Sequence, residues 1–299
     1  MQTKKIDISV ALIQDCSSYV CLRRKSQSFN NYIEFPGGKL LAGESASDCL
    51  LRETNEELDI DIKKFKFIGT IKHLYEDLLI KINVYKIFKY HGDIHSNEGR
   101  EIVAYSPMSN LKILPTHHRI LNLLKLPRLL KILTEEDFIS NEKLELTRYT
   151  SLRLRGISYD FYKQNIKHQL VSQKYMGSIY IDYPYNLDWE DYYHGLHFTS
   201  SNLHHYEQHK KDPTITYSAS CHTKNDIKIC NEKLFDFILI SPVLCNHDLY
   251  TAINWSGFSK LSDYSYLPTY ALGGLSSESS DFKICTKHNG FGISGISKV

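Results

Sequence analysis

Residues 33–60 read IEFPGGKLLAGESASDCLLRETNEELDI, and this stretch decides how the first part of the chain folds. It contains three glycines and seven carboxylates, arranged as a loop followed by a segment of mostly good helix formers. No proline falls between Ala46 and Leu58, so the sequence predicts a helix over these residues. Ser45 precedes the helix and can cap it, because its hydroxyl can accept from a free backbone N–H of the first turn.

The predicted helix gathers carboxylates on one face. At about 100° per residue, Glu53, Glu56 and Glu57 fall on the same side. Like charges this close raise one another's proton affinity unless a cation lies among them. A hard divalent cation such as magnesium, which prefers oxygen ligands, is therefore predicted at this face. Three residues are predicted to form the side that contacts the core: Leu51, Thr54 and Leu58.

The spacing of these residues is similar to the Nudix box, G-x5-E-x7-REUxEExGU. The required positions are held by Gly38, Glu44, Arg52, Glu53, Glu56 and Glu57. Two positions differ, since Thr54 stands where an aliphatic residue is usual and Asp59 stands where the box has glycine. Aspartate tolerates the left-handed conformation at a helix end better than most residues do. The alternative interpretation, an acidic helix face that is merely solvated, does not require such long and strict spacing.

The resemblance implies an N-terminal Nudix domain over residues 1–125, an α/β/α sandwich with a mixed sheet, that hydrolyses phosphoric anhydrides. It also implies that Glu53 is the general base, that Arg52 orients the Glu53 carboxylate, and that Glu44 supports the loop. Magnesium, with manganese as an alternative, would neutralise the phosphate chain and activate water. The implied metal ligands are the Gly37 carbonyl, Glu53, Glu56, Glu57 and Glu98, with Glu101 as the competitor of Glu98.

Residues 34–39, EFPGGK, are shared with the MutT-like nucleoside triphosphate pyrophosphohydrolases of this family. That resemblance implies an 8-oxo-dGTP diphosphatase, which releases pyrophosphate and removes oxidised dGTP before a polymerase can insert it. The implied substrate-binding residues are Arg23, Glu34, Phe35, Pro36, Gly37, Gly38 and His117. For Arg23, a solvated basic turn is the alternative. The asparagine that reads the base in these enzymes is replaced by His117 or His118, which leaves the base specificity open.

The composition of the whole chain limits the class of protein to which it can belong. A chain of 299 residues favours two domains, and a net charge of +2 gives no electrostatic reason to expect binding to long nucleic acids. Seven cysteines, scattered without CxxC pairs, favour reduced thiols in a cytoplasmic protein. No stretch is predicted to serve as a signal peptide or to span a membrane.

Secondary structure in the first domain follows from periodicity. Residues 115–124 are predicted to form a helix that begins at a proline. The predicted strands of the mixed sheet are residues 6–13, 18–23, 65–71, 78–89 and 102–105.

The segment Leu-Lys-Leu-Pro at residues 124–127 is the predicted domain boundary. Beyond it, short apolar runs alternate with amphipathic stretches, which is typical of β-α units. The predicted strands are residues 128–133, 152–155, 178–182, 195–198, 214–220, 235–240, 268–272 and 291–295. Eight such units predict a (β/α)8 barrel of the TIM type over residues 127–299, so the fold class is α/β.

The phrases LRLRG, GLHFTSSNL, SASCHT, FILISPV and YALGGL resemble thiamine phosphate synthase and its TenI-like relatives. Residues that keep the synthase pattern, and form the candidate ligand site of the barrel, are Arg155, Asp182, Ser220, Gly273 and Gly274. Ile157 replaces a lysine, Asn202 replaces a magnesium-binding aspartate, and residues 245–248 replace the pyrophosphate loop. We therefore expect a barrel without synthase activity.

The second hypothesis is a thiamine-pathway protein whose barrel binds a thiazole or thiamine phosphate, while the Nudix domain acts on a related diphosphate. The histidines of the barrel match no compact zinc motif, so ordinary surface and strand-end positions are expected for them. These histidines are His194, His197, His204, His205 and His222.

Overall fold

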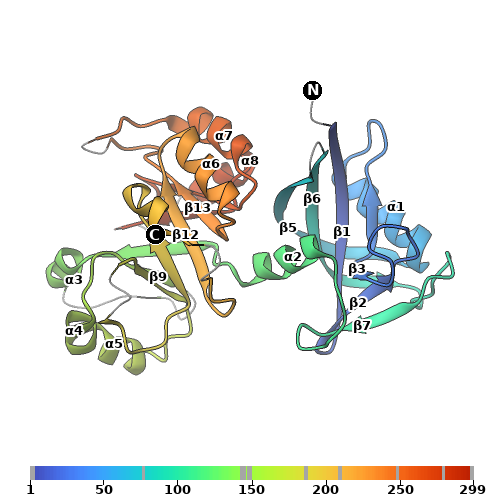
Figure 1. Ribbon diagram of the computed structural model, residues 1–299, viewed down its shortest axis with the longest axis horizontal. Coiled ribbons are helices and arrows are strands. Elements are labelled where there is room, and N and C mark those ends of the chain that lie inside the picture. The colour runs from blue at the N-terminus through green and yellow to red at the C-terminus, as the bar shows by residue number, and fades with distance from the viewer. Residues whose placement is uncertain are drawn as a thin grey trace. The chain divides into compact units, whose positions relative to one another are not determined.

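A computed structural model describes residues 4–75, 78–141, 146, 150–184, 188–207, 211–246, 249–277 and 280–296. The chain divides into two compact units, Met1–Leu126 and Pro127–Val299 (Figure 1). Both units combine helices with sheets, so the predicted α/β class is confirmed. No described helix is long and apolar enough to cross a membrane.

The first unit contains a seven-stranded mixed sheet with the order β3-β2-β1-β6-β5, in which β4 pairs with β1 and β7 pairs with β2. Strands β1 and β6 run parallel, whereas the other neighbours are antiparallel. The strands are β1 (Lys4–Asp15), β2 (Ser18–Arg23), β3 (Ile33–Glu34), β4 (Gly37–Lys39), β5 (Asp61–Tyr75), β6 (Leu78–His91) and β7 (Ile102–Tyr105).

Helix α1 (Ala46–Leu58) has the predicted bounds and ends. The Ser45 hydroxyl accepts from the Asp48 backbone N–H at 3.1 Å, and Asp59 adopts the left-handed conformation with φ of 56°. Leu50 and Leu58 pack into the core together with Ala11 of β1.

The prediction that Leu51 contacts the core is wrong, because its side chain is 36% exposed while Leu50 is fully buried. Since successive residues differ by about 100° around a helix, a small error in the assumed core direction exchanges these two neighbours. Helix α2 (Pro115–Lys125) starts at the predicted proline and contacts β5.

The second unit is a closed barrel of parallel strands in sequence order, which confirms the predicted barrel. Each of the eight predicted segments overlaps a strand, although β9 begins one residue before its predicted segment and β12 ends one residue after its own. The strands are β8 (Leu129–Leu133), β9 (Ser151–Leu154), β10 (Ile179–Asp182), β11 (Gly195–Phe198), β12 (Thr216–Cys221), β13 (Phe237–Ile240), β14 (Thr269–Leu272) and β15 (Gly292–Gly295).

Helical segments connect most of these strands. They are α3 (Glu135–Asn141), α4 (Tyr159–Phe161), η1 (Tyr162–Ile166), α5 (Lys167–Ser172), η3 (Ser200–His205), α6 (Lys224–Glu232), α7 (Asn254–Tyr264) and α8 (Asp281–Lys287).

Aromatic rings fill part of the barrel interior. Tyr180, Phe237 and Tyr270 are buried, and the Phe237 ring lies 5.6 Å from that of Tyr180 and 4.8 Å from that of Tyr270. Gly292 makes room for this packing, because a Cβ atom there would lie 2.5 Å from the Tyr270 ring. The interior is therefore packed with side chains, as in other barrels of this size.

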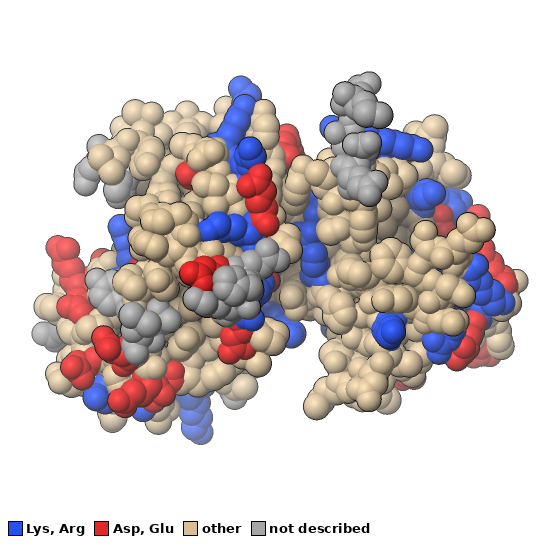
Figure 2. Space-filling view, in the orientation of Figure 1, with Lys and Arg blue, Asp and Glu red and all other residues tan. Residues whose placement is uncertain are grey.

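Charged side chains of both signs are interspersed on the face drawn in Figure 2, without a continuous basic stripe on that face. All seven cysteines are free thiols, as the sequence predicts.

Candidate active site

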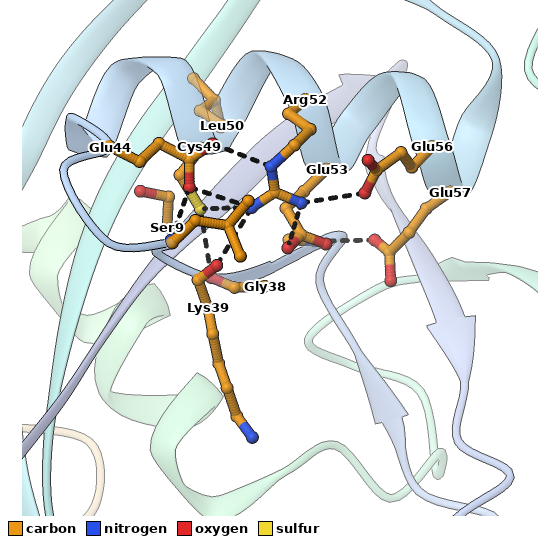
Figure 3. A network of polar contacts seen from close by, with 12 residues as sticks. Ser9, Gly38, Lys39, Glu44, Cys49, Leu50, Arg52, Glu53, Glu56 and Glu57 are labelled. Atoms are coloured by element: carbon orange, nitrogen blue, oxygen red, sulfur yellow. Dashed lines mark hydrogen bonds and ion pairs between the residues drawn. The ribbon is translucent and has the colours of Figure 1, made fainter.

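Glu53 projects from α1 against strand β4, which contains Gly38. A Cβ atom on Gly38 would lie 2.3 Å from the Glu53 carboxylate, so a larger residue at this position would displace that carboxylate. The carboxylates of Glu53 and Glu57 point toward one another (Figure 3). The short-range helix spacing predicted from the sequence therefore brings these two groups together.

Arg52 is the centre of a network of carboxylates (Figure 3). Its Nε donates to Glu44 Oε1 at 2.8 Å, and its Nη1 donates to Glu53 Oε1 at 2.8 Å and to Glu56 Oε2 at 2.9 Å. Glu44 also accepts from the Leu41 backbone N–H at 2.8 Å, and these two donors hold the pKa of Glu44 at about 2. Glu44 thus remains an anion that fixes Arg52, and Arg52 fixes the Glu53 carboxylate.

Glu57 is the buried member of the carboxylate set, with 6% of its surface exposed. Its Oε2 accepts from the Gly37 backbone N–H at 2.8 Å, and its Oε1 accepts from Arg100 Nη1 at 2.6 Å. Burial outweighs both donors and raises the pKa of Glu57 to about 7, with the nearby charge of Glu53 acting in the same direction. A second cation near Glu57 would stabilise its ionised form.

The donor chemistry fits a hard divalent cation, because the candidate ligands supply carboxylate oxygens. Among the described residues, however, no three His, Cys, Asp or Glu side chains lie close enough together to hold a metal ion. Glu56 is ion-paired with Arg52, and Glu57 is ion-paired with Arg100. Glu98 lies farther out, with 56% of its side chain exposed and 3.9 Å between its Oε2 and Arg100 Nη1.

Two predicted substrate residues, Glu34 and Arg23, lie beside this cluster. Glu34 of β3 forms ion pairs with Arg24 and with Arg100. Arg23 donates to Glu101 Oε2 at 2.6 Å and to the Asn31 carbonyl at 3.1 Å, so its guanidinium is held at the surface. Glu101 is engaged by Arg23, whereas Glu98 lies near Arg100, the partner of Glu57.

Phe35 and His117 form a buried stacked pair with one unsatisfied polar atom. Their rings stack with centroids 5.2 Å apart and planes 12° apart, and both side chains are buried. His117 Nδ1 lies 3.2 Å from the Thr116 hydroxyl, but within the described part of the chain the buried Nε2 has no hydrogen-bond partner. His118 is exposed, so His117 is the histidine that stacks on Phe35.

In the barrel, a buried polar network lies on neighbouring strands. Arg153 of β9 donates from Nε to Asp182 Oδ1 at 2.8 Å and from Nη2 to Oδ2 at 3.0 Å. His197 of β11 lies between two hydroxyls, with Nδ1 2.9 Å from Ser218 and Nε2 2.8 Å from Ser220.

Asp182 pairs with Arg153, whereas Arg155 is exposed. The expectation of an ordinary surface or strand-end position is wrong for His197, which is fully buried. Successive residues of a strand face opposite sides, so Arg153 and Asp182 meet on the same face of the neighbouring strands β9 and β10.

Gly273 and Gly274 follow β14 with φ of 110° and 71°, conformations that glycine adopts most easily. They lie against the backbone of the loop after β13. Of the predicted replacement for the pyrophosphate loop, Cys245 and Asn246 are described, and residues 247 and 248 lie outside the described residues.

The family model of the NUDIX domain matches residues 3–124. An 8-oxo-dGTP diphosphatase of Buchnera aphidicola subsp. Acyrthosiphon pisum is 32% identical over 98 residues, which cover 32% of this chain and 78% of that protein. The chain belongs to the Nudix family. It is a Nudix hydrolase, and enzymes of this family generally use a divalent metal and act on nucleotides.

Two other relatives extend the comparison. A CTP pyrophosphohydrolase of Escherichia coli is 26% identical over 110 residues, which cover 36% of this chain and 82% of that protein. A candidate thiamine-phosphate synthase of Aquifex aeolicus is 25% identical over 184 residues, which cover 58% of this chain and 98% of that protein. The aligned 58% of this chain is longer than the Nudix unit Met1–Leu126, so the similarity to the Aquifex aeolicus protein includes residues of the barrel.

Sequence reasoning missed two arginines of this Nudix hydrolase, Arg100 and Arg153. Arg100 follows Gly99 in a polar loop, and no local pattern distinguishes it from a solvated residue. Arg153 stood within the quoted phrase LRLRG, on a predicted strand that alternates leucine and arginine, and its place between two leucines is the signal that could have found it. A charged residue at a buried strand position requires a partner.

Burial of His117 predicts a pH dependence of the free energy of unfolding. Burial, aided by the charge of Arg24, lowers the pKa of His117 from 6.5 to about 3. The unfolded chain therefore binds a proton that the folded chain rejects, and stability falls as the pH drops from 6.5 toward 3, by about 1.4 kcal/mol per pH unit at most. His117→Phe, which keeps the ring, is expected to remove this slope.

The measurement is urea unfolding of the Nudix hydrolase between pH 7 and pH 4.5. His118→Gln is the matched control, because His118 is exposed and its replacement leaves the buried ring in place. Equal slopes for the wild type and His117→Phe would contradict the assignment of this pH dependence to His117.

Proposed function

We propose that the Nudix unit is a divalent-metal-dependent nucleoside triphosphate pyrophosphohydrolase whose main substrate is 8-oxo-dGTP. The observation that carries this proposal is the Glu53 carboxylate, which lies against Gly38, is oriented by Arg52, and points toward Glu57. The name of the Buchnera relative supports the choice of 8-oxo-dGTP. Removal of oxidised dGTP would keep it from the DNA polymerase and so protect DNA replication.

In the proposed mechanism, Glu53 acts as the general base toward a water molecule. The water oxygen forms a bond to the β-phosphorus, and Glu53 takes the proton. The bond between that phosphorus and the oxygen bridging to the α-phosphorus breaks, so the products are a nucleoside monophosphate and pyrophosphate. Arg52 keeps the carboxylate aimed during the proton transfer.

Magnesium or manganese, when bound, supplies charge neutralisation of the phosphate chain and a lower pKa of bound water. The residues that would hold it are Glu53, Glu56, Glu57 and Glu98, together with the carbonyl of Gly37. Glu56 and Glu57 would exchange contacts with Arg52 and Arg100 for contacts with the cation, since these arginines now neutralise the two carboxylates.

The proposed nucleobase pocket is formed by Phe35 and His117, with Glu34 at its edge. Phe35 stacks on His117 and would hold the imidazole ring in place beside the base. The unpartnered Nε2 of His117 supports a role in reading the base, because a hydrogen bond from a ligand would satisfy a buried polar atom that has no partner among the described residues. Arg23, Pro36 and the backbone of Gly37 and Gly38 would contact the rest of the nucleotide.

A substrate panel tests this function. Pyrophosphate release would be measured with magnesium for 8-oxo-dGTP, dGTP, CTP, other nucleotides, nucleotide sugars and thiamine diphosphate. We expect the highest kcat/KM for 8-oxo-dGTP, no release in EDTA, and a weaker base preference in His117→Phe. A higher kcat/KM for a substrate without a guanine base would contradict the assignment.

The similarity to the Aquifex aeolicus relative favours a second candidate function. In it, the barrel binds a thiazole or thiamine phosphate near Arg155, Ser220, Gly273 and Gly274, and the Nudix unit hydrolyses a related diphosphate. Synthase activity is not expected, because Ile157 is buried and apolar and the Asn202 side chain donates to the Tyr183 carbonyl at 3.3 Å. Preferred hydrolysis of thiamine diphosphate in the panel would support this second function over the first.

A further inference from the structure

Arg100 lies in the polar loop between β6 and β7, and its side chain is 13% exposed. The Ser96 hydroxyl accepts from the Arg100 backbone N–H at 2.8 Å and so fixes the start of this side chain. The guanidinium reaches across to two other elements, β3 and α1. It forms ion pairs with Glu34 of the proposed nucleotide pocket and with Glu57 of the proposed metal site.

Both oxygens of the Glu57 carboxylate are therefore engaged. The Gly37 backbone N–H donates to Oε2 at 2.8 Å, and Arg100 Nη1 donates to Oε1 at 2.6 Å. A cation that binds Glu57 must weaken one of these two contacts, because a guanidinium and a divalent cation on one carboxylate repel each other.

The Gly37 contact is the more rigid of the two. Gly37 pairs with Val10 in the sheet, and a Cβ atom on Gly37 would lie 2.0 Å from the Ser9 carbonyl oxygen, so the strand is closely packed there. Arg100, in contrast, belongs to a loop and has another carboxylate in reach. Glu34 already accepts from its Nη2.

We propose that Arg100 is a positioning residue that competes with the divalent cation for Glu57 and turns to Glu34 when the cation binds. This inference rests on the proposed metal site but not on the identity of the nucleotide. Arg100 neutralises Glu57 before the metal arrives, and it sets how tightly the metal is held. Through Glu34, the same side chain links occupancy of the metal site to the nucleotide pocket.

The test measures binding of Mn²⁺ to the full chain by electron paramagnetic resonance of the free ion, without any nucleotide. Arg100→Gln is expected to bind Mn²⁺ about tenfold more tightly than the wild type, because a charge-assisted hydrogen bond to Glu57 no longer has to be broken. Titrations at pH 8.5 keep Glu57 ionised, since its pKa is about 7. Arg100→Lys, which keeps the positive charge, is expected to stay within threefold of the wild type (roughly 0.7 kcal/mol).

Lys25→Gln is the matched control for a change in net charge. Lys25 Nζ donates to the carbonyl of Gly99, the neighbour of Arg100, so the control removes a positive charge from the same loop contact without touching Glu57. Its Kd for Mn²⁺ is expected to stay close to that of the wild type. An equal tightening in Lys25→Gln would show a general charge effect and overturn the role of Arg100.

A merely structural role for Arg100 predicts the opposite change, since loss of a structural contact would weaken Mn²⁺ binding. A Kd for Arg100→Gln that equals or exceeds the wild-type Kd would therefore overturn this inference and leave the proposed function in place. A wild-type chain that binds no Mn²⁺ would overturn the proposed metal site and the inference with it. Tighter binding by Arg100→Gln also requires a folded site, so misfolding cannot imitate the expected result.

Discussion

Glu53→Gln is expected to lower kcat for pyrophosphate release about a thousandfold, because the amide cannot accept the proton of the attacking water. Glutamine has the same shape as glutamate, so the close packing against Gly38 and a hydrogen bond from Arg52 Nη1 can both persist. The loss should therefore lie in the chemical step and in metal binding, with little change in the stability of the fold.

Asp48→Asn provides the matched control for this replacement. Asp48 lies on the same helix and undergoes the same chemical change, but its carboxylate accepts from the Ser45 hydroxyl at the start of α1, away from Glu53. Steady-state pyrophosphate release with magnesium is the measurement for both variants, and Asp48→Asn should keep nearly full activity. Full activity in Glu53→Gln would remove Glu53 from the mechanism.

Asp182→Ala is expected to destabilise the barrel by about 3–5 kcal/mol, because it leaves Arg153 as a buried charge without its partner. The Arg153 and Asp182 side chains are 3% and 7% exposed, and two hydrogen bonds join them. A loss of this size is a large part of the stability of an ordinary domain.

The double replacement of Arg153→Met with Asp182→Leu tests the cause of that loss. With neither charge present, the double variant should be more stable than Asp182→Ala, although it lacks the same ion pair. Both tryptophans, Trp189 and Trp255, lie in the second unit, so tryptophan fluorescence during urea unfolding reports on the barrel alone. If the double variant is as unstable as Asp182→Ala, the unpaired charge is not the cause.

This ion pair also bears on the proposed ligand site of the barrel. Asp182 keeps the synthase pattern in the sequence, but both of its oxygens are occupied by Arg153. A ligand that used Asp182 would have to replace a buried bidentate contact. The Ser220 hydroxyl is likewise already hydrogen-bonded, to the buried His197. The glycines after β14 are therefore the part of the predicted site with fewer competing contacts.

Local sequence determined the elements of this protein. The bounds of α1, its Ser45 cap and its left-handed end at Asp59 follow from residues that are neighbours along the chain. The strands of the barrel follow from short apolar runs, and the Nudix resemblance follows from fixed spacing within one loop and one helix. Each of these features depends on contacts within about two helical turns or one strand, which a linear pattern can display.

Only the tertiary structure decided which partner each buried charge receives. Arg100 and Glu57 are separated by 43 residues, and Arg153 and Asp182 by 29, so no local periodicity connects them. The choice between His117 and His118 depended on which side of α2 faces Phe35. Sheet register and helix packing bring these side chains together. Burial then makes an unpaired charge costly in free energy, so the fold decides the ion pairs around the residues that the sequence motif names.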